Sequence, residues 1–388
     1  MTHNTPNIPA RMMVIAPSAF MNSLAIGTSS LGMLFVVKDV YGASPAAVSS
    51  IGALWSVSYF VGCIVLCKVA ASLRPRTSMM ISLASGLTGF VLFLLFPGLV
   101  QAFVATATYG FLTAFFWPVV MGWLSKGHDG KELNRSTSLF SVSWSLGGII
   151  SSFLGGWLSE MGKFLPLIFT ATMYGINLVF IILSHRFVHD DPEIVPEAGA
   201  PVKAEDRSTP LRYPAWLGVF MVYMVMGIVF YVFPVFARDE LAMSESAIGI
   251  ALMIRAACMF VGFYLVGRLV FWQFRKRIIP ALSVIMMAVL AFMMLAGKPS
   301  SYVMAFAILG MLQSVMYNNS LFYGTSGAPD RNKRASIHET VLNLGQVIGS
   351  IGGGIVYQAM GMSVVFGSLL VLVLAGTLAQ GWMLTRMR

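Results

Sequence analysis

Residues 135–162 read RSTSLFSVSWSLGGIISSFLGGWLSEMG, and residues 334–361 read RASIHETVLNLGQVIGSIGGGIVYQAMG. The two stretches have the same length and align without a gap at an offset of 199 residues. Both begin with Arg and end with Met-Gly, and the identical pairs between these ends are Val142/Val341, Ile149/Ile348, Ser151/Ser350 and Gly155/Gly354. Similarity at one fixed spacing indicates that a structural unit occurs twice in the chain.

A spacing near 200 residues appears at two further places. They are the basic loop at residues 74–76, matched at residues 275–277, and the pair Gly110 and Trp117, matched by Gly310 and Tyr317 at an offset of 200. Offsets near 200 at three places predict two parallel copies of a multi-helix unit.

The composition assigns this unit to a membrane. Of the 388 residues, 57% are hydrophobic and 10% are charged, and the mean hydropathy is +0.80. Soluble domains contain about 25% charged residues, so a soluble enzyme, a nucleic-acid-binding domain and a disordered chain are excluded. The formal net charge of +10 does not indicate nucleic acid, because the basic residues lie in short loops between apolar runs.

The apolar runs predict an all-α polytopic membrane protein with twelve transmembrane helices. Each run is long enough to cross a bilayer core as a helix, which takes about 20 residues. The runs are residues 12–37, 46–70, 77–97, 99–125, 136–159, 163–187, 214–237, 244–272, 277–297, 299–325, 335–358 and 361–385. We expect the first run to remain as a helix, because no small-residue cleavage site follows the polar residues 1–9.

One long polar stretch divides the runs into six and six. Residues 188–213 are rich in Pro, Ala and charge, which is typical of a flexible linker. The sequence therefore predicts an N-terminal six-helix bundle at 1–187, a linker at 188–213 and a C-terminal six-helix bundle at 214–388.

Lys and Arg predict the orientation. If the N-terminus lies inside, twenty of the 25 Lys and Arg residues fall in inner loops and tails, four fall outside, and Arg255 belongs to neither side. Such a bias on short loops places both termini and the linker in the cytoplasm. We expect a multi-pass protein of the inner (cytoplasmic) membrane.

Twelve spans, cytoplasmic termini, a central inner linker and two parallel halves resemble the major facilitator superfamily. The resemblance covers essentially the whole chain and implies two pseudosymmetric bundles that rock around a central cavity by alternating access. It also implies that spans one, four, seven and ten line that cavity, and that the basic loops after spans two and eight take part in gating. The gating candidates are Arg74, Arg76, Arg275 and Arg277.

Two local motifs depart from the superfamily's usual pattern. In the loop CKVAASLRPRTS, Cys67 stands where Gly is usual and Ala71 where Asp is usual. In span five, Ser151 and Ser152 replace the Gly-Pro step of proton-coupled drug antiporters. The first departure weakens the analogy with the family's charge-relay gating at this loop, and the second weakens the analogy with its drug antiporters.

Arg255 is the sharpest functional signal. It lies about 16 Å along its helix from the outer end of the run, near the middle of a bilayer core of about 30 Å. An Arg there costs about 2.5–3.5 kcal/mol on insertion scales, so it should face water or a partner. Its guanidinium offers paired donors to carboxylate or phosphate, which indicates an anionic substrate. The alternative is a structural network with carbonyls and amide side chains.

Polar and aromatic residues in the four cavity-lining spans are further substrate-binding candidates. Polar side chains buried in a membrane need hydrogen-bond partners, so a hydrogen bond between helices is an equally good interpretation for each candidate. The candidates are Asn22, Tyr109, Trp117, Tyr223, Tyr231, Gln313, Tyr317, Asn318 and Asn319.

His338 and Glu339 lie one turn inside span eleven and form a possible proton-coupling site, since His titrates near neutral pH. The alternative is a solvated helix start, where Glu complements the helix dipole. We find no pattern of catalytic residues, metal ligands or cofactor motifs, and direct use of ATP is excluded because no P-loop is present.

The sequence therefore predicts a secondary active transporter of a small organic solute rather than an enzyme, and it favours an anion as that solute. Its expected partners are that solute, a proton or other coupling ion and the lipid bilayer, without nucleic acid, and we expect the monomer to function. The alternatives are a drug or sugar efflux antiporter of the same fold and a membrane sensor that binds a ligand without transporting it. A channel fits less well, because the duplication suits alternating access.

Overall fold

The computed structural model describes residues 10–125, 130–186, 188, 208–269, 272–328 and 331–387. Every regular element in these ranges is a helix, and twelve helical spans are long and apolar enough to cross a membrane. The twelve-span all-α fold is therefore confirmed. Most of the predicted linker, residues 187 and 189–207, lies outside the described residues.

By its internal contacts the chain falls into two compact units. The N-terminal unit contains residues 1–42 and 54–195, and the C-terminal unit contains residues 43–53 and 196–388. Most of the second span thus groups with the first unit and its beginning with the second. The domain boundaries expected from the linker composition remain a prediction.

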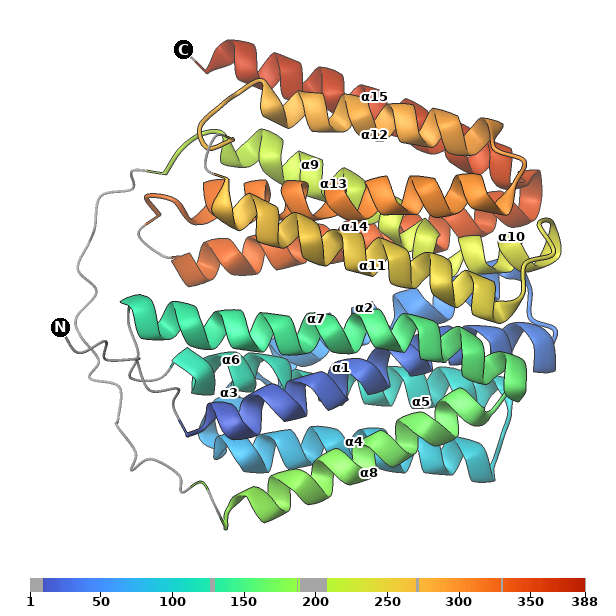
Figure 1. Ribbon diagram of the computed structural model, residues 1–388, viewed down its shortest axis with the longest axis vertical. Helices are drawn as coiled ribbons and strands as arrows, with labels where there is room; N and C mark the ends of the chain where they lie inside the picture. The colour runs from blue at the N-terminus through green and yellow to red at the C-terminus, as the bar shows by residue number, and fades with distance from the viewer. Residues whose placement is uncertain are drawn as a thin grey trace. The chain divides into compact units, whose positions relative to one another are not determined.

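The N-terminal unit contains helices α1 to α8 except the start of α2, which groups with the C-terminal unit up to Ala53 (Figure 1). Their bounds are α1 Met12–Phe35, which continues as a π-helical turn over Val36–Val40, α2 Pro45–Val65, α3 Cys67–Ser72, α4 Pro75–Leu95, α5 Leu99–Leu112, α6 Trp117–Ser125, α7 Gly130–Met161 and α8 Leu165–Ser184. The fourth span is broken into α5 and α6 by a 3₁₀ turn over Thr113–Phe115. Pro118 explains the break, because its ring lacks an N–H and clashes with the carbonyl one turn earlier.

The C-terminal unit contains the remaining helices. They are α9 Arg212–Tyr231, α10 Phe233–Asp239, α11 Glu245–Arg268, α12 Ile278–Leu295, α13 Pro299–Thr325, α14 Arg331–Met360 and α15 Met362–Arg386. Pro234 separates α9 from α10 in the same way as Pro118 divides the fourth span. In Figure 1, α12 runs beside α15, and α13 and α14 run beside α9.

Glycines in α7 allow close contact with α1. A Cβ added at Gly147 would lie 2.6 Å from the carbonyl oxygen of Phe20, and one at Gly155 would lie 3.0 Å from Leu31 Cβ. Only residues without side chains let two helix backbones approach so closely. The small residues Gly147, Ser151 and Gly155, spaced four apart in span five, therefore form a packing surface within the N-terminal unit.

The C-terminal unit repeats this contact between α14 and α9. A Cβ at Gly345 would collide with the Phe220 carbonyl, and one at Gly353 would lie 2.6 Å from Ile228 Cγ1. Gly353 rather than Gly354 corresponds to Gly155, because Gly354 faces Ser49 instead of α9. The gap-free alignment of the two stretches is thus one residue out of register at this contact.

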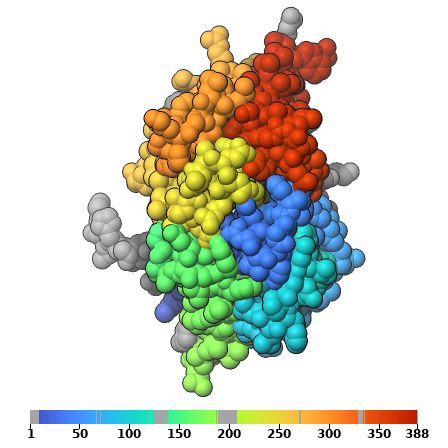
Figure 2. All heavy atoms as spheres, turned by 90° about the vertical axis from the view of Figure 1, so that its right-hand side faces the viewer, coloured from blue at the N-terminus to red at the C-terminus, as the bar shows by residue number. Residues whose placement is uncertain are grey.

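At one end of each unit, two aromatic rings pack against each other near the connections between helices. Phe93 and Phe164 have ring centroids 6.3 Å apart in the N-terminal unit, and Tyr302 and Phe366 have centroids 6.3 Å apart in the C-terminal unit. Figure 2 shows this end, with the green α7–α8 connection beside the cyan α4–α5 connection and the orange α12–α13 connection beside the red α14–α15 connection.

Candidate functional site

The site is built around Arg255 in the C-terminal unit. Arg255 lies in the middle of α11 and is only 4% exposed. One terminal nitrogen of its guanidinium donates a hydrogen bond of 2.6 Å to Gln313 Oε1 on α13. The same nitrogen lies 3.8 Å from the sulfur of Met259, and the guanidinium carbon lies 4.5 Å from the ring centroid of Phe230 on α9.

These contacts leave the charge of Arg255 uncompensated. Within the described part of the chain, no carboxylate forms an ion pair with Arg255. Its Nε is buried and has no hydrogen-bond partner among the described residues. A buried cation normally needs a counter-charge and a full set of hydrogen bonds, so the site retains the capacity to bind an anion.

Gly310 makes the arrangement possible. A Cβ at Gly310 would collide with the backbone carbonyl of Arg255, so α13 contacts the backbone of α11 at this level. Gln313 follows three residues later on the same helical face. The close approach therefore brings the Gln313 amide to the Arg255 guanidinium.

A row of aromatic side chains extends from this pair to the beginning of α14. Tyr223 on α9 and Tyr317 on α13 have ring centroids 6.5 Å apart, and Phe263 on α11 lies 5.6 Å from Tyr317. The Tyr317 hydroxyl donates to Glu339 Oε1 at 3.3 Å. The Tyr223 hydroxyl also interacts with the Gln313 side chain, so Arg255 and Glu339 are connected through side chains of one unit.

His338 precedes Glu339 in the chain, but its side chain is buried and has other contacts. It is fully buried, its Nδ1 lies 2.7 Å from Ser320 Oγ, and its ring meets that of Tyr317 edge-on with centroids 4.6 Å apart. Its Nε2 has no hydrogen-bond partner in the part of the chain that the structure describes. Glu339 itself is exposed, so the pair presents one solvent-accessible carboxylate and one buried imidazole.

The other predicted residues of this unit have varied surroundings. Asn318 donates to the Ser314 carbonyl of its own helix at 3.0 Å. Asn319 is buried, and neither of its amide atoms has a hydrogen-bond partner within the described ranges. Tyr231 is buried with its ring against Gly52. The structure therefore gathers Arg255, Gln313, Tyr223, Tyr317, His338 and Glu339, whereas Asn318 is bonded to its own helix and Tyr231 packs against Gly52.

The three candidates of the N-terminal unit have packing partners of their own. Tyr109 is buried in an aromatic cluster, and its hydroxyl accepts a hydrogen bond from the Tyr174 hydroxyl. Trp117 is partly exposed and contacts the rings of Phe116 and Phe140. Asn22 is buried with its amide nitrogen unpartnered.

The gating candidates fall into two kinds. Arg74, Arg275 and Arg277 are exposed, whereas Arg76 is 1% exposed. Arg76 donates to the Val188 carbonyl at 2.6 Å and lies 2.8 Å from His185 Nδ1. It therefore ties the start of α4 to the chain that follows α8.

Sequence reasoning missed Phe230, Ser320 and Met259 as parts of the site. A phenylalanine in a Phe-rich apolar run and a serine in a membrane helix carry no distinguishing signal. Their roles arise from contacts between α9, α11, α13 and α14, and only the fold brings these together. The one available hint was the position of Phe230 next to Tyr231 in a predicted cavity-lining span.

Two similar helical units, one of them with a buried cation, are features of polytopic membrane proteins that bind or transport solutes. Residues 15–336 match the family model described as Major Facilitator Superfamily. The chain belongs to this superfamily. A search of curated proteins finds no match.

Solved structures of the same fold cover nearly the whole chain. A bacterial homologue of the human lysosomal transporter Spinster is 13% identical with a TM-score of 0.77, over 98% of this chain and 99% of that one. A POT family transporter in complex with 5-aminolevulinic acid is 10% identical with a TM-score of 0.79, over 95% and 94%. A mutant of the nucleoside transporter NupG is 14% identical with a TM-score of 0.69, over 96% and 99%. At these identities the likeness establishes the fold alone.

Proposed function

We propose that this protein is a secondary active transporter that carries a small organic anion across the cytoplasmic membrane by alternating access. Its termini and linker lie on the cytoplasmic side. Arg255 binds the negative group of the solute. The observation that carries the proposal is a buried guanidinium whose polar partner is the neutral amide of Gln313.

Electrostatics favours an anion at this position. Burying an unpaired charge costs several kcal/mol even after relaxation, and the Gln313 amide and Phe230 ring compensate only in part. A bound carboxylate or phosphate accepts charge-assisted hydrogen bonds from the free N–H groups of Arg255. The guanidinium fork also fixes the orientation of a planar carboxylate.

The surrounding rings favour an organic solute over a bare inorganic ion. Phe230 lies against the guanidinium, and Tyr223, Phe263 and Tyr317 continue the aromatic surface toward α14. Small-molecule sites typically combine such apolar walls with a few placed polar groups. A POT family transporter of the same fold holds 5-aminolevulinic acid, an organic acid.

Glu339 is the proposed site of proton coupling. Its carboxylate is exposed and accepts a hydrogen bond from Tyr317, whose ring is a neighbour of Tyr223. Protonation of Glu339 would change this hydrogen bond, and the change reaches the anion site through two tyrosines. His338 supports the arrangement by packing against Tyr317.

A thermal-shift panel on the purified protein tests the proposal. Organic anions, sugars and lipophilic cations are compared on wild type and on Arg255→Gln, which keeps an amide near Gln313. A ligand at 100 times its Kd should stabilise the protein by about 2.7 kcal/mol. We expect one class of organic anion to stabilise wild type but not the variant.

Arg268→Gln is the matched control, because Arg268 is an exposed arginine at the end of the same helix. It should retain the anion response. Stabilisation by cations or sugars that survives Arg255→Gln would make Arg255 structural and favour an efflux pump. Anion binding without any transport would favour a sensor.

A further inference from the structure

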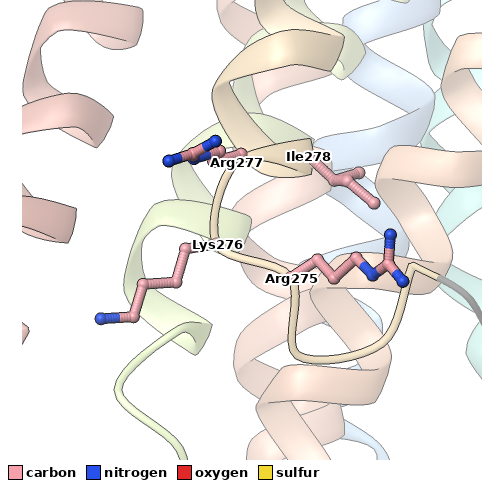
Figure 3. A pocket seen from close by; sticks show the side chains of 4 residues that line it. All are labelled: Arg275, Lys276, Arg277 and Ile278. Atoms are coloured by element: carbon pink, nitrogen blue, oxygen red, sulfur yellow. The ribbon is translucent and has the colours of Figure 1, made fainter.

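The connection between α11 and α12 presents three consecutive cations. Arg275, Lys276, Arg277 and the adjoining Ile278 line a cavity of about 580 Å³. Figure 3 shows Lys276 and Arg277 extending from one side of the connection and Arg275 from the other. All three side chains are exposed, so this end of the bundle carries a concentrated positive charge.

Aromatic packing fixes the backbone that carries these cations. Phe274 has a φ of +57°, a conformation that costs energy for a residue with a bulky side chain. It is held there by contacts with Phe322 and Tyr323, whose ring centroids lie 5.4 and 5.9 Å away. Tyr323 also donates to the Trp272 carbonyl at 3.2 Å. The cations are therefore presented by a braced turn.

Within the described part of the chain, no carboxylate pairs with Arg275 or Arg277. In the described part of this unit, the carboxylates Asp239, Glu240 and Glu245 lie at the α10–α11 connection, and Glu339 contacts Tyr317. The ammonium of Lys276 donates to the Met387 carbonyl at 2.6 Å. The side chains of Arg275 and Arg277 form no hydrogen bond or ion pair with any described residue. Their charges are available to an external anion.

An apolar surface begins beside the basic turn. Val284 and Ile285 of α12 are exposed about 10 Å further along the helix from Ile278. The adjacent α15 exposes Leu378 and Trp382. The two helices are joined by a hydrogen bond of 2.9 Å between Ser283 and Gln380. An amphiphile could therefore place its charge at the turn and its chains along α12 and α15.

We infer that Arg275, Lys276 and Arg277 bind the phosphate head group of an anionic phospholipid, with its acyl chains against α12 and α15. Basic clusters at the membrane surface attract anionic lipids. The continuity of cations with an exposed apolar face distinguishes a lipid from free phosphate. The guanidinium of Arg386, 4.1 Å from the Trp382 ring centroid, lies at the end of α15 and adds to the positive charge there.

Native mass spectrometry of the delipidated full-length protein tests this inference. Phosphatidylglycerol and phosphatidylcholine with the same acyl chains are titrated onto wild type. Each Lys or Arg near an anionic surface favours binding by roughly fivefold. We expect retention of one phosphatidylglycerol, and the variant Arg275→Gln/Lys276→Gln/Arg277→Gln should bind it up to about 100-fold more weakly.

The control variant Lys68→Gln/Arg74→Gln/Arg186→Gln removes three exposed cations from the N-terminal unit and should bind phosphatidylglycerol as wild type does. On wild type itself, high salt should weaken phosphatidylglycerol but not phosphatidylcholine, which keeps the test valid if the triple variant fails to fold. Equal binding of the two lipids would overturn the inference. So would unchanged binding of phosphatidylglycerol by a folded Arg275→Gln/Lys276→Gln/Arg277→Gln variant. Displacement of phosphatidylglycerol by millimolar inorganic phosphate would also overturn it, because the pocket would then be a free-anion site.

Discussion

Three uncharged groups contact the positive charge of Arg255 inside its membrane helix. An amide oxygen, a thioether and an aromatic face each attract a cation without neutralising it. They lower the cost of burial and still leave the site net positive. A carboxylate partner would have given a more stable protein and a weaker anion site.

The variant Gln313→Glu tests whether the uncompensated charge of Arg255 binds the anion. The new carboxylate would sit at hydrogen-bond distance from the guanidinium and act as an internal counter-ion. We expect a higher melting temperature together with at least tenfold weaker anion binding, a loss of about 1.4 kcal/mol. The measurement is a thermal shift with and without the anion.

Asn318→Asp is the control for Gln313→Glu, because it makes the same charge change one turn further along α13 at a residue bonded to its own helix. It should bind the anion more strongly than Gln313→Glu does. Wild-type affinity in Gln313→Glu would show that Arg255 does not contact the solute.

The hydrogen bond between Tyr317 and Glu339 gives a second prediction at this scale. Glu339→Gln removes the titrating group but keeps an acceptor for the Tyr317 hydroxyl. We expect accumulation driven by a proton gradient to be lost, while exchange of labelled for unlabelled solute continues. The assay compares both modes in proteoliposomes, with Thr340→Ala on the next residue as control. Gradient-driven accumulation in Glu339→Gln would exclude this carboxylate as the coupling site.

Part of the site could be predicted from the sequence. Arg255 and Gln313 stand out because polar side chains are rare in apolar runs, and the structure joins them by a hydrogen bond. Phe230 and Ser320 could not be predicted, because their types are ordinary in membrane helices and their partners lie on other helices. Tyr109 had the right position in a predicted lining span, yet its hydroxyl is bonded to Tyr174 in the N-terminal unit.

At the scale of elements, the two units are built on the same close helix pair. α7 packs on α1 and α14 packs on α9, in both cases through glycines that face a backbone carbonyl. Dispersion contacts and close backbone approach take the place of the hydrophobic effect between helices in lipid. The repeated glycines are therefore structural positions that the duplication preserved.

Gly349 and Gly352 allow a matched test of this packing. A Cβ at Gly349 would collide with the carbonyl of Met224, whereas one at Gly352 would have no atom within 4 Å. Gly349→Ala should lower the free energy of unfolding by about 1–3 kcal/mol, as overpacking does. Gly352→Ala should be neutral or slightly stabilising, because alanine favours a helix. Equal melting temperatures in the two variants would contradict the packing argument.

The register of the repeat shows the limit of sequence alignment at this scale. The gap-free match pairs Gly155 with Gly354, but the contacts pair Gly155 with Gly353. The three consecutive glycines at 352–354 make the alignment degenerate by one residue. A helix turns by about 100° per residue, so one position decides which neighbour the glycine faces.

For the whole molecule, hydropathy was sufficient to predict the number and position of the spans. The twelve helices begin and end within a few residues of most predicted runs, because each run must match the thickness of the bilayer. The breaks at α5–α6 and α9–α10 were not predicted, since proline inside a spanning helix is tolerated in many ways.

The topology gives a prediction for the whole chain. A periplasmic reporter fused after Arg388 should be inactive, because an even number of spans and the Lys and Arg bias predict a cytoplasmic C-terminus. The same reporter fused after Gly297, in the α12–α13 connection, should be active. Activity after Arg388 would contradict the orientation.

The central claim is that Arg255 binds the transported anion. The most direct test is uptake into proteoliposomes of the organic anion that stabilises wild type. We predict uptake by wild type and by Arg268→Gln, and at least tenfold slower uptake by Arg255→Gln, about 1.4 kcal/mol in transition-state terms. Uptake by Arg255→Gln at the wild-type rate would contradict the claim.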